Sequence, residues 1–481
     1  MASNENWARI WNTALDGLHK LDPIKISYEE SAAFLRSLIK TRLLKHTDLR
    51  DNPERFFLAH KLVALKTFQL HWQTGSAFWI RFTVHYNLCV GTVLALGNEG
   101  HIKSLQDMQT EGQLGCFGLT EKHAGVSSGL VVEATADYNP DTREFILNTV
   151  EEGSAKNWIS SGLVADKTVV VANLRLKGKS YGPHAFLIDM RRNGELVPGV
   201  MVGDMGRKTL GNDLDNAWIM FNDVNVPYQA LLDKYAEVDA GHNYVPKLKG
   251  VPEFHRIGQR LFTGRVAVAQ AALEFRRWLF AKTTEYANER QCWTPAGDRP
   301  LAEVPQLKQL LQENDRNQRE MDVFVSECEA QLCVCLRADV LPSVTLCDAI
   351  AVAKAKAVED SIQFVNRLSN EVGSYALMAG SGFDKRDFLI GCKFAEGDTR
   401  VLMQKIARDR MRQFGAKEAK HVPPGQYDAE MRQCANLVAA LKAGGGPAAW
   451  DLNHLMVYKL AEIVMDRIVR DFVNAPIASK L

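Results

Sequence analysis

Residues 115–121 read Gly-Cys-Phe-Gly-Leu-Thr-Glu and stand where the character of the sequence changes. Before them, apolar residues recur three and four positions apart, which is typical of helices that bury one face. After them, as far as about Pro227, glycines and β-branched residues are frequent, as in short strands joined by turns. From about Ile257 the helical period returns and persists. This order predicts an α+β fold.

The middle section is expected to form a compact β barrel or sandwich of about 110 residues. The turn sequence Asn-Pro-Asp-Thr at 139–142 predicts a hairpin between the first two strands. The expected strands are 131–136, 144–147, 168–172, 185–188 and 217–221.

The C-terminal half is expected to be an antiparallel four-helix bundle, because four long amphipathic segments follow one another there. These segments are 260–289, 305–336, 346–371 and 396–414, and a last helix is expected at 452–472. The chain therefore divides into four expected domains. They are an N-terminal helical domain (1–112), a middle β domain (113–232), a helical bundle (233–416) and a helical extension (417–481).

Composition excludes several classes of protein. Hydrophobic residues make up 46% and charged residues 24% of 481 residues, and the net charge is +1, so a nucleic-acid surface is not expected. The longest apolar run, Leu88–Leu96, is much shorter than the roughly 20 residues of a membrane span. Cys333 and Cys335 are too close in sequence for a zinc pair, so we expect no metal.

The chain ends in Ser479-Lys480-Leu481. A C-terminal S-K-L is an address that the peroxisomal import receptor reads. We therefore expect the protein in the peroxisome, and the alternative is a polar tail without a role.

An ordered series of motifs resembles the acyl-CoA oxidase and dehydrogenase superfamily. The stretch 115–121 resembles its flavin-binding signature, and 234–238 is typical of the oxidase branch. The other matching stretches are 155–160, 286–290, 380–383, 396–399 and 406–408. Each is weakly specific alone, but their order over roughly residues 50–415 is specific. The family fold, with an N-terminal helical domain, a β barrel and a four-helix bundle, agrees with the periodicity.

The resemblance implies that FAD is the cofactor and that a fatty acyl-CoA is oxidised between Cα and Cβ. This reaction needs a base for the α-proton, donors for the thioester oxygen and a hydride acceptor. Glu396 matches the family base, and its backbone N–H is expected to help hold the thioester oxygen. Gly397 leaves room for the substrate. The alternative for Glu396 is a helix N-terminal glutamate near the macrodipole.

Three residues of the β domain match flavin contacts. Thr120 resembles the threonine that bonds the pyrimidine edge, and Trp158 the tryptophan against the isoalloxazine. The alternatives are an ordinary strand threonine and a core aromatic. Ser160 matches a family position near flavin N5, where oxidases usually have glycine and dehydrogenases threonine.

The helical half supplies further expected contacts. Arg290 resembles an arginine that reaches the FAD pyrophosphate of a neighbouring subunit, and Trp293 is expected near the adenine. Gly380 and Gly382 are expected to let the backbone approach the dinucleotide. A homodimer or homotetramer follows from these contacts. The alternative for Arg290 is a solvated helix arginine, and the alternative for the two glycines is a helix-ending turn.

Two residues are expected to contact the substrate outside its reacting atoms. Arg265, which the resemblance places with Arg290 on one long helix, is expected near the CoA portion, and its alternative is again a solvated arginine. Ser127 is expected to replace a serine that contacts the pantetheine, because Val126 occupies the usual position.

The leading hypothesis is a peroxisomal acyl-CoA oxidase of fatty acid β-oxidation, in which O2 reoxidises the flavin and gives H2O2. Ser160 favours the first alternative, a dehydrogenase that passes electrons to a protein acceptor. A catalytically silent relative that acts as a binding protein is the second. Only residues 417–481 follow the bundle, so we expect the second helical domain of typical oxidases to be at most vestigial.

Overall fold

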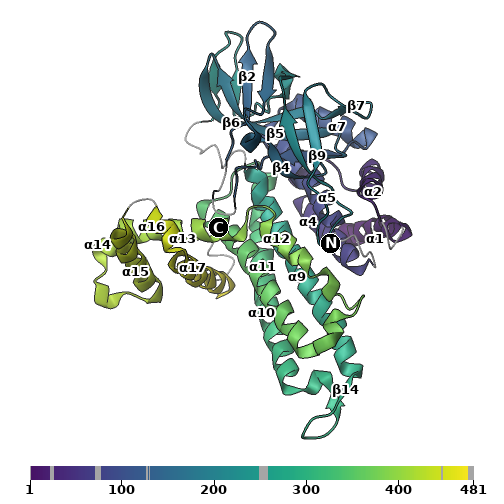
Figure 1. Cartoon of the computed structure of the whole chain (residues 1–481), viewed down its shortest axis with the longest axis vertical. Helices are drawn as coiled ribbons and strands as arrows, with labels where there is room; N and C mark the ends of the chain where they lie inside the picture. Colours follow the sequence, from purple (N-terminus) through teal and green to yellow (C-terminus); the bar gives the residue numbers. More distant parts are fainter. Residues whose placement is uncertain are drawn as a thin grey trace. The chain divides into compact units, whose positions relative to one another are not determined.

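The computed structural model describes residues 2–21, 26–70, 77–125, 128, 131–248, 258–445 and 448–474 (Figure 1). The chain forms two compact units. Unit 1 comprises Met1–Ala267, Cys333–Leu341 and Ala376–Phe388, and unit 2 comprises Val268–Leu332, Pro342–Tyr375 and Leu389–Leu481. Within the described ranges, no helix is long and apolar enough to cross a lipid bilayer.

Unit 1 begins with helices. They are α1 (Ala2–Leu15), α2 (Tyr28–Lys40), α3 (Asp48–Asp51), α4 (Pro53–Gln69), α5 (Phe78–Thr83), α6 (Gly91–Leu96) and α7 (Glu99–Glu111). A π-helical turn, η2 (Val84–Val90), joins α5 to α6. Gly112 ends α7 with a φ of +71°, a left-handed conformation that favours glycine. The chain then enters the β structure.

Two sheets follow in unit 1. The larger has the order β1-β5-β2-β3-β11, and β6 pairs with β5; the smaller has the order β4-β10-β9. Their bounds are β1 (Gly115–Gly118), β2 (Thr135–Asn139), β3 (Glu144–Asn148), β4 (Lys156–Ser160), β5 (Lys167–Leu176), β6 (Lys179–Asp189), β9 (Val200–Asp204), β10 (Asn216–Phe221) and β11 (Val224–Pro227). Side chains from both sheets, including Phe145, Phe186 and Ile219, form one buried core. Burial of this apolar surface is the main force that holds the sheets together.

The α+β prediction is confirmed, and four of the five predicted strands lie within observed strands. The strand predicted at 131–136 instead begins at Thr135. The reason is that the Glu121 carboxylate accepts the N–H groups of Glu133 (2.6 Å) and Ala134 (3.0 Å). These donors are therefore satisfied outside a sheet ladder.

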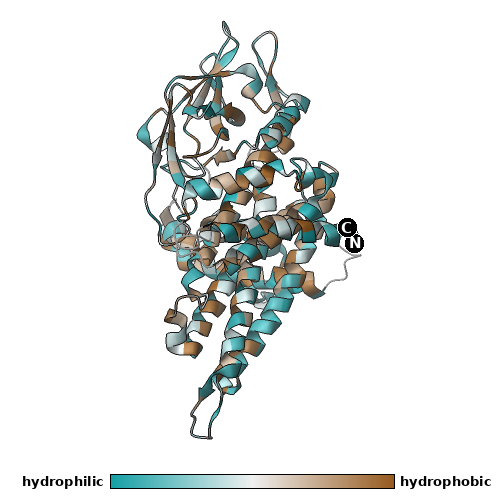
Figure 2. Cartoon of the chain, turned by 90° about the vertical axis from the view of Figure 1, so that its right-hand side faces the viewer, coloured by the Kyte–Doolittle hydropathy of each residue, from teal (hydrophilic) through white to brown (hydrophobic). Residues whose placement is uncertain are grey.

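Most of the long helices lie wholly or mainly in unit 2. They are α9 (Gln259–Glu289), α10 (Pro305–Arg337), α11 (Val344–Val372), α12 (Asp387–Phe394), α13 (Thr399–Gln413), α15 (Ala429–Gly444), α16 (Ala448–Leu452) and α17 (His454–Asn474). Arg276 of α9 donates to Gln318 of α10 (2.7 Å). Ser361 of α11 donates to the carbonyl of Ala272 (3.3 Å). Figure 2 shows hydrophilic and hydrophobic residues alternating along these helices, as expected for amphipathic segments.

Three of the four predicted bundle helices match α9, α10 and α11 within two residues. The fourth prediction, 396–414, is wrong at its start because α13 begins at Thr399. Asp398 accepts the N–H of Arg400 (2.7 Å) and caps the helix there. The predicted last helix overlaps α17, whereas α12 and α15 were not predicted. The four-domain division stays a prediction.

His85, a buried histidine of unit 1, contacts β1, the strand that contains the start of the motif 115–121. The Gly115 N–H, at the start of β1, donates to Nδ1 of His85 on η2 (3.0 Å). Burial, with the nearby charge of Arg36, lowers the pKa of His85 to about 3. Only neutral imidazole can accept at Nδ1. An unfolded histidine gains its proton below about pH 6.5, so this stabilisation is complete above that pH and lost as the pH falls.

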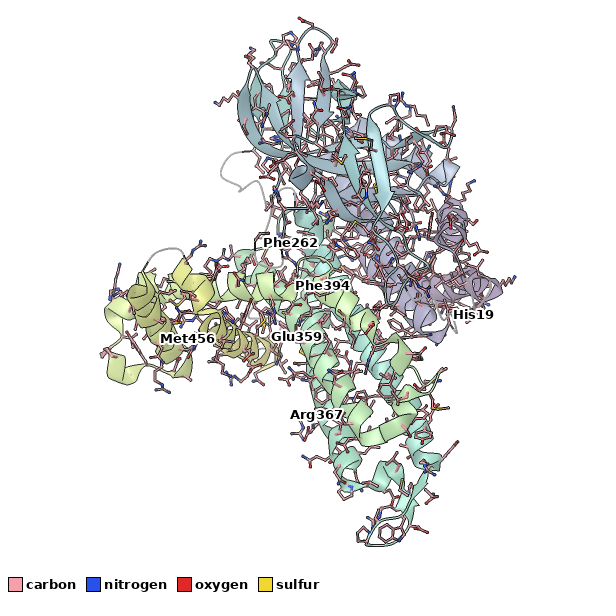
Figure 3. The ribbon with its side chains drawn as sticks, in the orientation of Figure 1. His19, Phe262, Glu359, Arg367, Phe394 and Met456 are labelled. Atoms are coloured by element: carbon pink, nitrogen blue, oxygen red, sulfur yellow. The ribbon has the colours of Figure 1, made fainter. Side chains whose placement is uncertain are left out.

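We expect His85→Asn, whose oxygen can replace Nδ1 as acceptor, to weaken the acid sensitivity of unit 1. Between pH 7 and pH 5, the free energy of unfolding should fall by about 2 kcal/mol more in the unchanged protein than in the variant. Urea unfolding at the two pH values measures this difference. His19→Asn is the control, because His19 is exposed (Figure 3). An equal pH effect in all three proteins would contradict the assignment.

Candidate functional site

The predicted flavin-contacting residues of unit 1 lie in two segments, just after the end of β1 and on β4. Thr120 is exposed beyond the end of β1, and its carbonyl accepts the Asn157 N–H (2.8 Å). Trp158 on β4 is 54% exposed. The Ser160 hydroxyl accepts from the Asn216 amide (3.1 Å). The alternatives of a strand threonine and a core aromatic are therefore wrong, and an exposed indole is available to a planar ligand.

The backbone of this segment is strained. Trp158 has a φ of +57° and Ser161 one of +67°. A side chain in this left-handed region costs of order 1–3 kcal/mol, and such residues concentrate at functional sites. The strain is therefore consistent with a ligand-binding role for β4.

Arg81, a fully buried cation on α5, holds the end of this segment. It donates to the Ser161 hydroxyl (3.0 Å), to the carbonyl of Tyr28 (3.1 Å) and to that of Asp213 (2.9 Å). Asp215 lies 3.1 Å from the guanidinium. Burial lowers the pKa of Arg81, and the partners oppose this shift. The arginine thereby ties α5 to the loop that follows Ser160.

A buried ion pair, which we did not predict, fixes the loop that carries Thr120. Lys156 Nζ lies 2.7 Å from the Glu121 carboxylate, and both side chains are fully buried. The same Nζ donates to the carbonyls of Val171 (2.7 Å) and Leu119 (3.4 Å). Burial lowers the pKa of Lys156, and Glu121 opposes that shift. Glu121 and Lys156 lie in the motifs 115–121 and 155–160, and these motifs were the sequence feature that could have indicated the pair.

Arg265 is buried on α9, and its guanidinium lies 5.6 Å from the Phe262 ring centroid. The alternative of a solvated arginine is therefore wrong for this residue. Ser127 and Val126 lie outside the described residues.

Gly380 and Gly382 form a turn before a short 3-10 helix, η7 (Phe383–Lys385). Their φ values are +78° and +98°, so the turn itself requires glycine. Lys385 anchors the turn by donating to the carbonyl of Phe68 (2.7 Å). A helix-ending turn, the alternative interpretation, is thus enough to explain why both residues are glycine.

Glu396 lies in the turn between α12 and α13 of unit 2. Its side chain is buried, with 8% of the residue exposed. Glu396 has a φ of +58° and Gly397 one of +96°, so two consecutive residues are left-handed. The alternative of a helix N-terminal glutamate is wrong, because Asp398 is the N-cap and α13 starts at Thr399. A buried carboxylic side chain on a constrained turn suits proton transfer.

Arg290 and Trp293 lie at the end of α9 in unit 2. Arg290 is exposed and is the first residue after the helix, so its prediction within the helix is wrong by one residue. Its N–H donates to the Tyr286 carbonyl (3.0 Å). Trp293 is 79% exposed between the strands β14 (Gln291–Cys292) and β15 (Arg299–Pro300). Both side chains are accessible within the unit.

One group of described side chains has the spacing of metal ligands. His123, Glu133 and Glu151 bring ligand atoms within 4.8 Å of one another, and all three are exposed. Glu133 accepts from His123 Nδ1 (2.8 Å) and raises the pKa of His123. Exposed acidic groups commonly gather without an ion, so we assign no metal.

No known protein-family profile matches the sequence. Among curated proteins, the chain is 32% identical over 245 residues to human peroxisomal acyl-coenzyme A oxidase 3, which covers 50% of this chain and 34% of the relative. It is 31% identical over 285 residues to acyl-coenzyme A oxidase 2 of Yarrowia lipolytica, covering 58% and 39% respectively. The matches thus span little more than a third of these relatives.

Solved structures share the fold. Acyl-CoA oxidase-2 of Caenorhabditis elegans, bound with FAD, ascaroside-CoA and ATP, superposes with a TM-score of 0.77 at 18% identity, covering 97% of this chain and 75% of that one. Acyl-CoA oxidase3 of Yarrowia lipolytica gives 0.73 at 20% identity, covering 96% and 74%. At this identity the likeness establishes the fold.

The buried ion pair should be essential to the stability of unit 1. We expect Lys156→Met to cost about 3–5 kcal/mol in free energy of unfolding, because it leaves the Glu121 carboxylate buried without its cation. Urea unfolding followed by tryptophan fluorescence measures the loss. Lys122→Met is the matched control, because it breaks an ion pair of exposed side chains with Glu152. Equal destabilisation by both changes would show that burial of the pair is unimportant.

Proposed function

Because this chain belongs to the acyl-CoA oxidase and dehydrogenase superfamily, we propose that it oxidises acyl-CoA to trans-2-enoyl-CoA with FAD. In the proposed pathway of fatty acid β-oxidation, O2 reoxidises the flavin and gives H2O2. The observation that carries the proposal is Glu396, buried at 8% exposure in a left-handed turn beside Gly397. The names of the curated relatives support the oxidase activity.

The residues of unit 1 fit a flavin. Trp158 offers an exposed ring, and Thr120 is exposed, with its carbonyl accepting the Asn157 N–H. FAD, when bound, would accept the hydride from Cβ of the substrate. Thr120 and Ser160 would bond its polar edge, and Trp158 would pack against its ring. FAD in the C. elegans relative supports this cofactor.

Glu396 would accept the α-proton, and its N–H would bond the thioester oxygen. Gly397 has no side chain to obstruct the substrate at this point. Arg265, a buried cation, would meet the acidic CoA portion, with Ser127 nearby on the pantetheine. These roles divide the reaction into proton transfer, oxyanion stabilisation and substrate binding.

A homodimer or homotetramer is part of the proposal. The exposed Arg290 and Trp293 would contact FAD of a neighbouring subunit, together with the Gly380 and Gly382 backbone. A bidentate guanidinium suits a pyrophosphate.

We also propose a peroxisomal location. Two observations support it: the curated human relative is named peroxisomal, and the sequence ends in Ser479-Lys480-Leu481. The tripeptide lies outside the described residues. It would bind the peroxisomal import receptor.

Ser160 favours one further candidate, a dehydrogenase that passes electrons to a protein acceptor. Its hydroxyl bonds Asn216, whereas a glycine would leave that position without a side chain. A catalytically silent relative that acts as a binding protein is the remaining alternative, and a purified protein without flavin absorbance near 450 nm would favour it.

Glu396→Gln should abolish most turnover while binding persists. The amide cannot accept the proton, so we expect kcat to fall by about 10³-fold with flavin absorbance and acyl-CoA affinity nearly unchanged. Turnover and equilibrium binding of acyl-CoA measure the two effects. Glu303→Gln is the control, because Glu303 is exposed. Full activity of Glu396→Gln would assign the base to another residue.

The electron acceptor can be identified with a C16 acyl-CoA in air and no added acceptor. The oxidase proposal predicts H2O2 and enoyl-CoA in equal amounts, because each two-electron oxidation reduces one O2. Peroxide and enoyl-CoA are measured together. Rapid dye reduction with negligible peroxide would establish the dehydrogenase alternative.

A further inference from the structure

Lys354 lies in the middle of α11, and its side chain is completely buried. A buried ammonium is costly unless acceptors replace water. Its Nζ donates to the carbonyl of Lys393 (2.7 Å), the carbonyl of Gly397 (2.9 Å) and the hydroxyl of Thr399 (3.1 Å). An ammonium has three donor hydrogens, which match these acceptors. All four residues belong to unit 2.

The three acceptors bracket Glu396. Lys393 is in the last turn of α12, Gly397 directly follows Glu396, and Thr399 is the first residue of α13. The Thr399 hydroxyl also reaches the Lys393 carbonyl (3.3 Å), which closes the turn on itself. One cation thus gathers both ends of the turn and the peptide beside Glu396.

This arrangement counters a specific conformational cost. Glu396 has a Cβ and yet adopts a φ of +58°, a region that such residues avoid. Charge-assisted hydrogen bonds are stronger than neutral ones, and those of Lys354 are shielded from water. They can therefore hold the backbone of Glu396 in a conformation that it would otherwise leave.

Other contacts already attach the flanking helices to α11. Lys393 Nζ pairs with Glu359 (2.7 Å), and Lys405 Nζ pairs with Asp348 (2.7 Å), with all four side chains partly exposed. Figure 3 labels Glu359 on α11 and Phe394 at the end of α12. These pairs act at the side chains of α12 and α13, whereas Lys354 bonds the backbone of the turn.

We propose that Lys354 is a positioning residue, whose ammonium fixes the turn of residues 393–399 and thereby places the Glu396 carboxylate for proton abstraction. The inference rests on the proposed function, in which Glu396 is the base. Lys354 acts through the turn and needs no contact with the substrate. A lysine within an amphipathic helix would ordinarily be solvated, so its burial is the distinguishing observation.

The test compares Lys354→Met with Lys405→Met in the full-length protein. Methionine is also unbranched and is only one atom shorter than lysine, but it donates no hydrogen bond. Hydrogen exchange of the free protein should accelerate at least about tenfold in residues 393–399 of Lys354→Met. In Lys405→Met, which loses only the partly exposed pairs with Asp348 and Asp409, exchange there should stay unchanged.

Kinetics supply the second readout. We expect kcat of Lys354→Met to fall by about 10²-fold, with KM for acyl-CoA within about threefold and flavin absorbance retained, because a misplaced base slows chemistry more than binding. Lys405→Met should keep kcat within about threefold of the unchanged protein.

Unchanged exchange in Lys354→Met, or equal effects of the two changes, would overturn the inference. So would faster exchange with unchanged kcat. If the unchanged protein oxidises no acyl-CoA, the proposed function fails, and the exchange comparison still decides whether Lys354 holds the turn. Should Lys354→Met not fold, Thr399→Val removes one acceptor and should accelerate exchange less but in the same residues; no acceleration would overturn the inference.

Discussion

A buried cation must find its hydrogen-bond acceptors inside the protein, and three such cations, two in unit 1 and one in unit 2, hold segments that carry the candidate residues. Arg81 bonds Ser161, Lys156 bonds Glu121 and Lys354 bonds the carbonyl of Gly397. Each lies on a helix or strand of the packed interior. Because unsatisfied buried charge is so costly, each cation forces the loop that supplies its acceptors into one conformation.

This constraint matters because the backbone near these cations is strained. Trp158, Ser161 and Glu396 all have left-handed backbones. A residue with a side chain is strained in this conformation and keeps it only where other interactions compensate for the strain. Short loops between packed elements rarely bury enough apolar surface for that purpose. Hydrogen bonds from buried cations compensate for the strain without filling the space that a ligand needs.

The same principle explains how a widespread fold can carry a specific chemistry. The helices and sheets of both units are stabilised mainly by apolar burial, which tolerates many sequences. The resemblance to solved oxidases at 18–20% identity therefore concerns the arrangement of elements. The chemistry proposed for this chain depends instead on a few loop residues and on the polar groups that position them.

Sequence patterns predicted most of the elements, and their errors have identifiable causes. The long helices were predictable because apolar periodicity is a local property. The strand predicted at 131–136 begins late because the Glu121 carboxylate accepts the N–H groups of Glu133 and Ala134, which lie 12 and 13 residues further along the chain. The start of α13 was misplaced although Asp398 is a local capping signal, and the expected Arg290 position differed by a single residue at a helix end.

The amino-acid pattern alone was enough to predict the α+β class, the order of helical and β sections and the motifs that contain Glu396, Thr120 and Trp158. The burial of Lys354, the left-handed backbone of Glu396 and the exposure of Trp158 became known only from the folded chain. The physical reason is that burial and backbone strain depend on neighbours brought together from distant parts of the chain. A lysine at position 354 reads as a solvated helix residue until residues 393–399 fold against it.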